Sequence, residues 1–394
     1  MENNKKDFIV IICSCPFPFG NASDNAIYTF MAGFNEHGCE GEVVCLYPNL
    51  PCNYNCPSVG KYKGVNYRYL HKKVHRSKSK IINRVDVNFL SKFLLKRYLK
   101  RVAKSHRVTA LFIAHVSDGY YSNTKYCHSL GIRTVLVSCE YPEYLIETTS
   151  ERLIRFKELS SHTDKYIFET KTLEDYTKSA LNKDIDSIVI PATMPFEDIL
   201  QCQKTETNPY IAYCGSINSE EKDGLKSIIK AFSIFHNNFP GIMLKFIGRI
   251  TKPSYHLQLK DLVNNLNLQD SVTFVGEVDR AEYVQYVTNS SLMIVAKPKD
   301  SYYGGGLSSK VIEYLFSGNP VLMTDSDDYV YYLTHKKNVY FVHDNNPETL
   351  ADAMCILFNQ QEKMKTIGEN GRLYALDNFN YHKLTEGLLK FVLS

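Results

Sequence analysis

A stretch near the end of the chain combines a glycine-rich loop with a single carboxylate in a predicted helix. The run YYGGGLSSKVIEYLFSGNPVL, residues 302–322, contains Lys310 and Glu313 after three glycines and two serines. A glycine-rich loop lets backbone amides approach a ligand, and the start of a helix favours an anion such as phosphate. A carboxylate one turn further on suits hydroxyl groups, such as those of a ribose. The pattern predicts a nucleotide site; the alternative is a solvated Lys310–Glu313 pair on a surface helix.

The residues around this helix are typical of helix ends. Ser308 or Ser309 suits the N-cap, because a short hydroxyl can accept from the free amides of the first turn. Gly318 suits the left-handed position after a helix, and Pro320 cannot continue one. We therefore predict a helix from Ser309 to Ser317, followed by a buried strand, NPVLMT. Its buried stripe comprises Val311, Ile312, Leu315 and Phe316, and its other face comprises Lys310, Glu313 and Ser317.

Short apolar runs alternate with helical patterns in two successive parts of the 394-residue chain. This alternation is typical of doubly wound parallel sheets, in which ligands bind at the carboxyl ends of the strands. We expect an α/β protein with two Rossmann-like doubly wound domains that face a cleft. The expected parts are a domain over residues 1–192, a linker over 193–208, a second domain over 209–372, and a helix over 373–394 that packs back on the first domain.

Composition favours a cytoplasmic protein. No apolar run approaches the roughly 20 residues of a membrane span, and the opening MENNKKDFIVIICS has too few apolar residues for a signal peptide. The eleven cysteines lack the paired C-x2-C spacing of zinc sites. We expect free thiols.

One segment carries most of the positive charge. Residues 72–107 hold 13 lysines and arginines against one acid, Asp86, whereas the remainder holds 33 basic and 41 acidic residues. Within it, NFLSKFLLKRYLKRVAK predicts an amphipathic helix whose apolar face comprises Phe89, Leu90, Phe93, Leu94, Tyr98 and Val102. This composition favours contact with an anionic membrane surface, with a solvated basic helix as the alternative. Nucleic acid is disfavoured, because no recognition motif accompanies the charge.

Nearly the whole chain resembles the GT-B-fold glycosyltransferases, especially the retaining family 4. YCGSINSEEKDGLKSIIKAF is similar to that family's strand, glycine, basic loop and helix, and FVGEV is similar to its F-x-G-x-V turn. LMIVAKPKDSYYGGGLSSKVIEYLFSGNPVL is similar to its donor-site signature. The resemblance implies a donor site in the C-terminal domain and an acceptor site in the N-terminal domain.

The resemblance also implies roles for individual residues. Glu313 matches the glutamate that holds the ribose, and Lys222 matches the lysine that holds the pyrophosphate. Val278 falls where backbone groups contact the base, and Gly20 lies in the N-terminal loop over the phosphates. Backbone amides that face the sugar and phosphate are implied at Gly305, Gly306 and Leu307, and further phosphate contacts are expected of Lys297 and Lys310.

The chain departs from the family at three positions. Ser216 stands where an arginine is usual, Gly305 stands where the first of two glutamates is usual, and the strand near Cys139 lacks a histidine. Lys297 or Lys310 could replace the missing charge. Glu140 or His115 could act as polar groups near the sugar, which makes them candidate catalytic residues beside Lys222. For each of these residues a structural role is the alternative.

The expected activity is retaining, metal-independent transfer of a sugar from a UDP- or GDP-sugar to a glycan or lipid-linked acceptor of bacterial envelope, capsule or lipopolysaccharide synthesis. Asp325–Asp327 mimics a metal-binding D-x-D, but we interpret it as an ordinary loop, so no metal or other cofactor is expected. The enzyme would work in the cytoplasm, peripherally at the inner face of the membrane. The alternatives are a nucleotide-sugar epimerase of the same fold and a catalytically inactive nucleotide-sugar-binding protein of a polysaccharide assembly.

Overall fold

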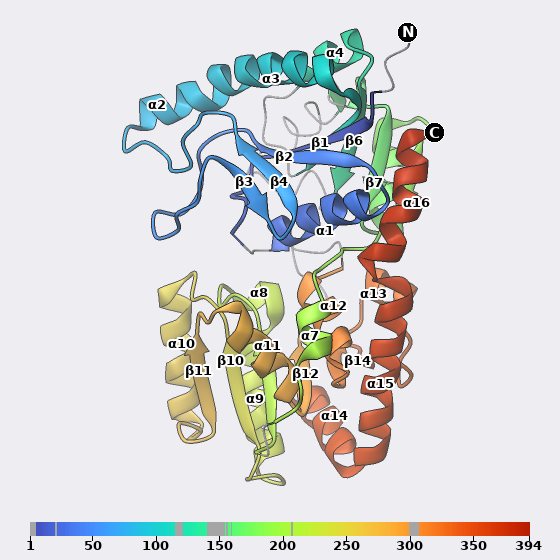
Figure 1. Ribbon diagram of the computed structural model, residues 1–394. Helices are drawn as coiled ribbons and strands as arrows, with labels where there is room; N and C mark the ends of the chain where they lie inside the picture. Colours follow the sequence, from blue (N-terminus) through green and yellow to red (C-terminus); the bar gives the residue numbers. More distant parts are fainter. Residues whose placement is uncertain are drawn as a thin grey trace. The chain divides into compact units, whose positions relative to one another are not determined.

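The computed structural model of the chain describes residues 5–19, 22–114, 121–139, 154, 157–158, 160–205, 208–298 and 307–394. The chain divides into two units, one of Met1–Met194 with Asn380–Ser394 and one of Pro195–Phe379 (Figure 1). Each unit contains one sheet of mainly parallel strands with flanking helices, as the alternation of apolar runs predicts. None of the helices in these ranges combines the length and the apolar character that crossing a bilayer requires.

The first unit is built on an eight-stranded sheet in the spatial order β3-β4-β2-β1-β5-β6-β7-β8. All neighbouring strands are parallel except β3 and β4. The strands are β1 Asp7–Cys13, β2 Glu40–Cys45, β3 Val59–Tyr62, β4 Val65–Tyr69, β5 Arg107–Ala114, β6 Arg133–Ser138, β7 Lys165–Phe168 and β8 Ser187–Val189. The helices are α1 Ala22–Glu36, α2 Lys80–Val85, a π-helical turn Asp86–Leu90, α3 Ser91–Ser105, α4 Tyr121–Ser129, α6 Lys171–Leu181 and α16 Tyr381–Leu393.

The hairpin of β3 and β4 is absent from the sequence-based prediction. Lys63 and Gly64 connect the two strands with φ angles of 46° and 88°, so both turn residues lie in the left-handed region. Turns of this kind match the twist of the flanking strands, and Asn-Gly or Asp-Gly marks them in most sequences. Here the first turn residue is Lys63, so the sequence lacks this marker of a hairpin.

The second unit is built on a six-stranded, fully parallel sheet in the order β11-β10-β9-β12-β13-β14. Its strands are β9 Tyr210–Cys214, β10 Met243–Ile247, β11 Val272–Gly276, β12 Leu292–Val295, β13 Val321–Thr324 and β14 Tyr340–Val342. Its helices are α7 Glu197–Gln201, α8 Glu220–Asp223, α9 Leu225–His236, α10 Pro253–Asn265, α11 Arg280–Asn289, α12 Ser309–Ser317, α13 Asp327–Tyr332, α14 Pro347–Asn359 and α15 Gln361–Asn378.

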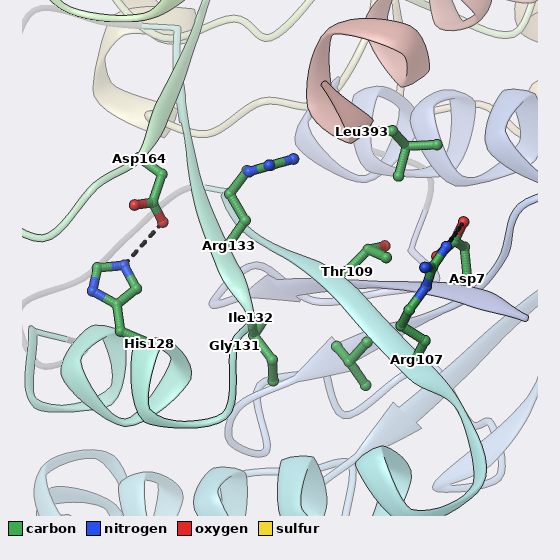
Figure 2. Close-up of a pocket in the computed structure, with 10 residues that line it drawn as sticks. Asp7, Arg107, Thr109, His128, Gly131, Ile132, Arg133, Asp164 and Leu393 are labelled. Atoms are coloured by element: carbon green, nitrogen blue, oxygen red, sulfur yellow. Dashed lines mark hydrogen bonds and ion pairs between the residues drawn. The ribbon is translucent and has the colours of Figure 1, made fainter. Parts of the chain in front are cut away.

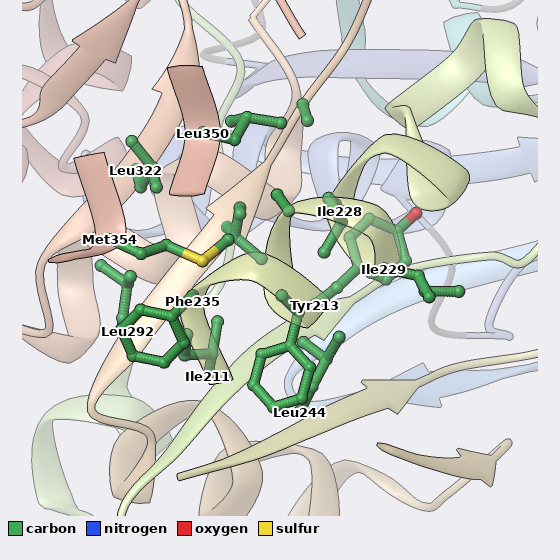
Figure 3. Close-up of a cluster of buried hydrophobic side chains, with 14 of the residues drawn as sticks. Ile211, Tyr213, Ile228, Ile229, Phe235, Leu244, Leu292, Leu322, Leu350 and Met354 are labelled. Carbon is green, nitrogen blue, oxygen red and sulfur yellow. The ribbon is translucent and has the colours of Figure 1, made fainter. Parts of the chain in front are cut away.

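The core of the second unit joins its strands to the apolar faces of α9 and α14. Ile228, Ile229 and Phe235 of α9 pack with Leu350 and Met354 of α14 against strand residues (Figure 3). The helical spacing of these side chains places them on the inward face of each helix. This packing fixes the central strands, and therefore the loops that leave their carboxyl ends.

Two expected boundaries change in the structure. The predicted helix over 373–394 is the end of α15 followed by α16, which begins after Asn380, whose side chain accepts from the backbone amide of His382. Helix α16 belongs to the first unit and packs on α1, where a Cβ at Gly33 would lie 2.0 Å from Thr385 Oγ1. The expected linker over 193–208 contains α7, whose Ile199 is buried.

Candidate functional site

The candidate site lies at the carboxyl ends of β9 and β12 in the second unit. These strands are neighbours in the middle of the sheet, and the chain continues from β9 to β10 on one side and from β12 to β13 on the other. Such a reversal of strand order leaves a crevice between the loops that follow the two strands. The loop after β9 leads to α8, and α12 follows β12 along the chain.

Glycines let the loops at this edge approach one another closely. Gly248 has a φ of +140°, and a Cβ there would lie 2.1 Å from the carbonyl oxygen of Gly215. Gly224 has a φ of +66°, and a Cβ there would lie 1.9 Å from the carbonyl oxygen of Ala296. Side chains are excluded at both positions, so the backbone itself forms this part of the edge.

A buried ion pair joins the loop after β9 to helix α12. The Lys310 ammonium donates to Asp223 Oδ2 at 2.7 Å, and the Tyr213 hydroxyl donates to the same oxygen at 2.6 Å. The side chains of Lys310 and Asp223 are 13% and 7% exposed. Burial alone would raise the pKa of Asp223, but the charge and hydrogen bond of Lys310 outweigh it and hold the pKa below its usual value. Lys310 therefore pairs with Asp223, and this ion pair positions α12 against the loop after β9.

Replacing Asp223 with asparagine should lower the free energy of unfolding by about 3 kcal/mol at neutral pH, because it leaves the Lys310 charge buried without a counter-ion. The folded pKa of Asp223 is depressed, so its stabilisation is present above the unfolded pKa near 3.9 and is lost as pH falls further. Urea unfolding between pH 3 and 7 should show a constant deficit above about pH 4 that narrows below it. Asp261→Asn, an exposed carboxylate on α10, is the matched control; an equal effect of both changes would contradict the buried pair.

Glu313 lies in a second buried cluster, which joins α12 to α11 and α7. Its side chain is 7% exposed, and its carboxylate forms an ion pair with Arg280. Its Oε2 also accepts from the Tyr283 hydroxyl at 2.8 Å. Burial, with the Glu313 charge, raises the pKa of Tyr283 well above its usual value, so this hydroxyl remains a donor. The interpretation of Lys310 and Glu313 as one solvated surface pair is therefore wrong.

Arg280 continues this cluster to the start of the second unit. Its guanidinium donates to both carboxylate oxygens of Asp198 in α7, at 2.7 and 2.8 Å, and to the carbonyl oxygen of Pro195 at 3.2 Å. Bidentate pairing of this kind fixes orientation as well as charge. Glu313 is thus paired with the Arg280 guanidinium, whose orientation is fixed by Asp198.

Helix α12 has the predicted bounds, and Gly318 has the left-handed conformation, with a φ of +75°. All four residues of the predicted buried stripe are buried, but so are Glu313, Tyr314 and Ser317. The polar face of α12 is therefore not exposed to solvent. It contacts other polar groups of the second unit. Arg280, Tyr283, Asp223 and Tyr213 are the residues that sequence reasoning missed. One signal could have pointed to such partners. A carboxylate and an ammonium on a helix that is buried on all sides each require a partner of opposite charge or a hydrogen-bond partner.

Three lysines gather around Asp223. Lys222 precedes it in α8, and both Lys222 and Lys310 contribute to the electrostatic environment of Asp223. Lys297 follows β12, and burial lowers the pKa of its ammonium. Leu307 is buried, and Val278 is half-buried just before α11. The structure thus brings Lys222, Lys297 and Lys310 together, whereas Glu313 lies in the separate Arg280 cluster.

The remaining predicted residues, Gly20, His115, Glu140, Gly305 and Gly306, lie outside the described residues. A small apolar pocket of about 20 Å³ in the first unit is lined by Ala114 and Cys139, the residues that precede His115 and Glu140 in the chain. It lies at the carboxyl ends of β5, β6 and β7.

A larger cavity of about 510 Å³ lies at the opposite edge of the first sheet, where β1, β5 and β6 begin (Figure 2). Four of its charged groups form two pairs, Arg107 with Asp7 at 2.6 Å and His128 with Asp164 at 2.9 Å, and Arg133 donates to the carbonyl oxygen of Val392. Ligands of doubly wound sheets bind at the carboxyl edge, so size alone does not make this cavity the candidate site.

The Asp325–Asp327 sequence directly follows β13, and Asp327 is the first residue of α13. Asp325 Oδ2 lies 3.3 Å from His343 Nδ1. Within the described part of the chain, no group of three or more histidine, cysteine or acidic side chains is arranged to hold a metal ion.

Residues 197–374 match the family model for glycosyl transferases group 1. The chain is 28% identical over 126 residues to the uncharacterized glycosyltransferase MJ1069 of Methanocaldococcus jannaschii, an alignment that covers 32% of this chain and 31% of that protein. It is 24% identical over 168 residues to spore coat protein SA of Bacillus subtilis, covering 41% and 43% respectively. The matches therefore span about a third to less than half of the length of these curated relatives.

Solved structures match over nearly the full length. Sucrose-phosphate synthase from Thermosynechococcus elongatus superposes with a TM-score of 0.73 at 16% identity, covering 98% of both chains. Anabaena Alr3699/HepE in complex with UDP and glucose superposes with a TM-score of 0.73 at 13% identity, covering 98% of this chain and 99% of that one. These likenesses show the GT-B fold. With the family match, they support a GT-B-fold glycosyltransferase.

Proposed function

We propose that this chain is a retaining glycosyltransferase of the family 4 type, which moves a sugar from a UDP- or GDP-sugar to a bacterial surface-glycan or lipid-linked acceptor. The observation that carries the proposal is the arrangement at the switch point of the second sheet. Lys222, Lys297 and Lys310 gather there around Asp223, and Asp328 is a further acid near Lys297. A nucleoside diphosphate is a ligand of matching charge.

In this proposal Lys222 and Lys297 bind the diphosphate. Lys310 is neutralised by Asp223 at 2.7 Å and acts mainly by positioning α12. Cations beside a departing diphosphate stabilise the negative charge that grows on it as the bond to the sugar breaks. The second part of the site would be Glu313. Arg280 and Tyr283 occupy one acceptor position on each of its oxygens, and a carboxylate has about four such positions, so it can still accept from ribose hydroxyls.

Retention would follow from attack on the same face of the sugar that the leaving group occupies. The bond between the anomeric carbon and the phosphate oxygen breaks, the acceptor oxygen bonds to that carbon, and the acceptor proton passes to the released phosphate. This step needs no protein nucleophile. It needs cations held in place beside the diphosphate and a site from which water is excluded. A protein can supply both.

The sugar and the nucleotide are best found by thermal stabilisation of the full-length protein with a panel of nucleotide-sugars. We expect one UDP- or GDP-sugar to raise the melting temperature more than its free nucleotide does. Incubating that donor with candidate acceptors then separates the alternatives. A transferase releases nucleoside diphosphate and forms a glycoside of unchanged anomeric configuration, an epimerase alters the sugar without any acceptor, and a binding protein leaves the donor intact. Failure of every nucleotide-sugar to stabilise the protein would contradict the proposal.

Transfer should survive an excess of EDTA, because we interpret Asp325–Asp327 as a loop and assign the diphosphate to lysines instead. The measurement is the initial rate of nucleotide release in the presence of donor and acceptor, with and without the chelator. Activity that falls with EDTA and returns with manganese or magnesium would contradict this part of the proposal.

We place the acceptor at the inner face of a membrane, with the enzyme as a peripheral cytoplasmic protein. The support is the basic segment over residues 72–107.

A further inference from the structure

One helical rod of the first unit presents large apolar side chains to solvent. Helix α2, the π-helical turn and α3 follow one another without a break (Figure 1). Ile81, Phe89 and Phe93 are 77%, 71% and 61% exposed. With Val85, which is 48% exposed, they recur at every fourth position and form one line along the rod. We call these four residues the exposed stripe; Ile82 and Leu90, which each follow one of them in the chain, are also exposed.

The fold does not use the exposed stripe, because another face of the rod packs on the sheet. Leu95, Tyr98 and Leu99 of α3 are buried in the core of the first unit. The sequence-based prediction placed Phe89, Phe93 and Tyr98 on one face; in the structure Tyr98 is buried and the two phenylalanines are not. The apolar residues thus divide into an inward set in α3 and an outward set centred on α2 and the turn.

Basic side chains surround the exposed stripe and continue beyond it. The exposed members are Lys78, Lys80, Arg84, Arg97, Lys100, Arg101 and Lys104. None of the lysines and arginines from 72 to 104 forms an ion pair with an acidic residue in the described ranges. The one acid of the segment, Asp86, lies 3.5 Å from the buried His71 and offsets little of this charge at the surface.

We propose that this rod docks on an anionic lipid bilayer, with the exposed stripe among the acyl chains and the flanking cations at the headgroups. Charge alone would suit any polyanion, but exposed isoleucines and phenylalanines gain free energy only where hydrocarbon replaces water. Anionic headgroups complement these cations, and each well-placed cation raises partition by roughly fivefold. The inference stands apart from the proposed activity, because nucleotide binding by the second unit can be measured in solution without lipid.

Vesicle flotation of the full-length protein tests the charge. Vesicles of phosphatidylcholine with about 30% phosphatidylglycerol should bind the protein at low salt, and neutral vesicles should bind it at least about tenfold less. Changing Arg84, Arg97, Lys100 and Lys104 to glutamine should lower partition by about 100-fold or more. The matched control changes four exposed lysines of the second unit, Lys230, Lys260, Lys337 and Lys363, to glutamine and should bind as the unchanged protein does.

A fluorescent reporter tests insertion. The chain contains no tryptophan, so Phe89→Trp places a single indole in the exposed stripe, and Tyr331→Trp places one at an exposed position of the second unit. On anionic vesicles the first should shift its emission to shorter wavelength and be quenched by brominated acyl chains, whereas the second should do neither. Changing Ile81, Phe89 and Phe93 to serine should weaken vesicle binding but leave heparin binding unchanged.

Three results would overturn the proposal. One is negligible flotation of the unchanged protein with anionic vesicles at low salt. Another is unchanged emission of the Phe89→Trp protein on vesicles that bind it. The third is equal lipid binding with and without the three serine substitutions, which would reduce the rod to a surface for polyanions such as nucleic acid. Donor-induced thermal stabilisation of the same variants, measured without lipid, reports on the proposed function separately.

Discussion

Replacing Lys222 with alanine should lower the rate of sugar transfer by about 100-fold or more, while donor affinity falls much less. Lys222 lies in α8 beside Asp223, at the carboxyl end of β9. Asp223 is already paired with Lys310, so it does little to neutralise the Lys222 charge. A cation in this place stabilises the leaving diphosphate more strongly in the transition state than in the bound donor, because the negative charge grows as the bond breaks.

The measurement is the single-turnover rate of nucleotide release with saturating donor and acceptor, with donor affinity from calorimetry. Lys230→Ala, an exposed lysine on the next helix, is the matched control. A rate within about twofold of the unchanged protein in the Lys222 variant would remove this residue from the proposed machinery.

Replacing Glu313 should weaken nucleotide binding by about 100-fold and remove the preference for ribose, because two hydrogen bonds to a charged group are lost. The informative comparison is between a ribonucleotide and its 2′-deoxy analogue. Calorimetry on the unchanged protein should show tighter binding of the ribonucleotide, and Glu313→Gln should bind both with similar affinity. A role of Glu313 limited to holding Arg280 would lower both affinities and leave their ratio unchanged.

Folding must be separated from binding in this test, since Glu313 is buried and pairs with Arg280. Glu313→Gln keeps the side-chain shape. Arg280 keeps its bidentate pair with Asp198 in this variant, so the protein should remain folded, which urea unfolding of the same preparation checks. Glu282→Gln, an exposed carboxylate on α11, is the control for charge. A full ribose preference in a folded Glu313 variant would contradict the assignment.

The sequence predicts the parts of this site that depend on local pattern. Residues 309–317 form the expected helix because its apolar spacing and Gly318 specify both its face and its end. The sheets follow because buried strands are continuous apolar runs. The partners of Glu313, Arg280 and Tyr283, come from α11, which is distant in the sequence. Nothing in the sequence of α11 indicates that its polar residues contact α12.

The rod over residues 80–105 also shows that local pattern does not determine tertiary contacts. Helical periodicity groups Phe89 and Phe93 with Tyr98, because a pattern shows which residues share a face but not which apolar face the sheet will cover. Tertiary packing buries Tyr98 and Leu99 and leaves the phenylalanines in solvent, and the π-helical turn at Asp86–Leu90 changes the phase between α2 and α3.

Hydrogen exchange with and without the stabilising nucleotide-sugar tests most directly whether the carboxyl edge of the second sheet binds the donor. We predict that donor slows amide exchange in residues 215–224 and 307–313, the described segments that hold Lys222, Asp223 and Glu313. Exchange in residues 107–109 and 131–133, which line the larger cavity of the first unit, should not change. Protection of the cavity segments with no protection of the second unit would contradict the account.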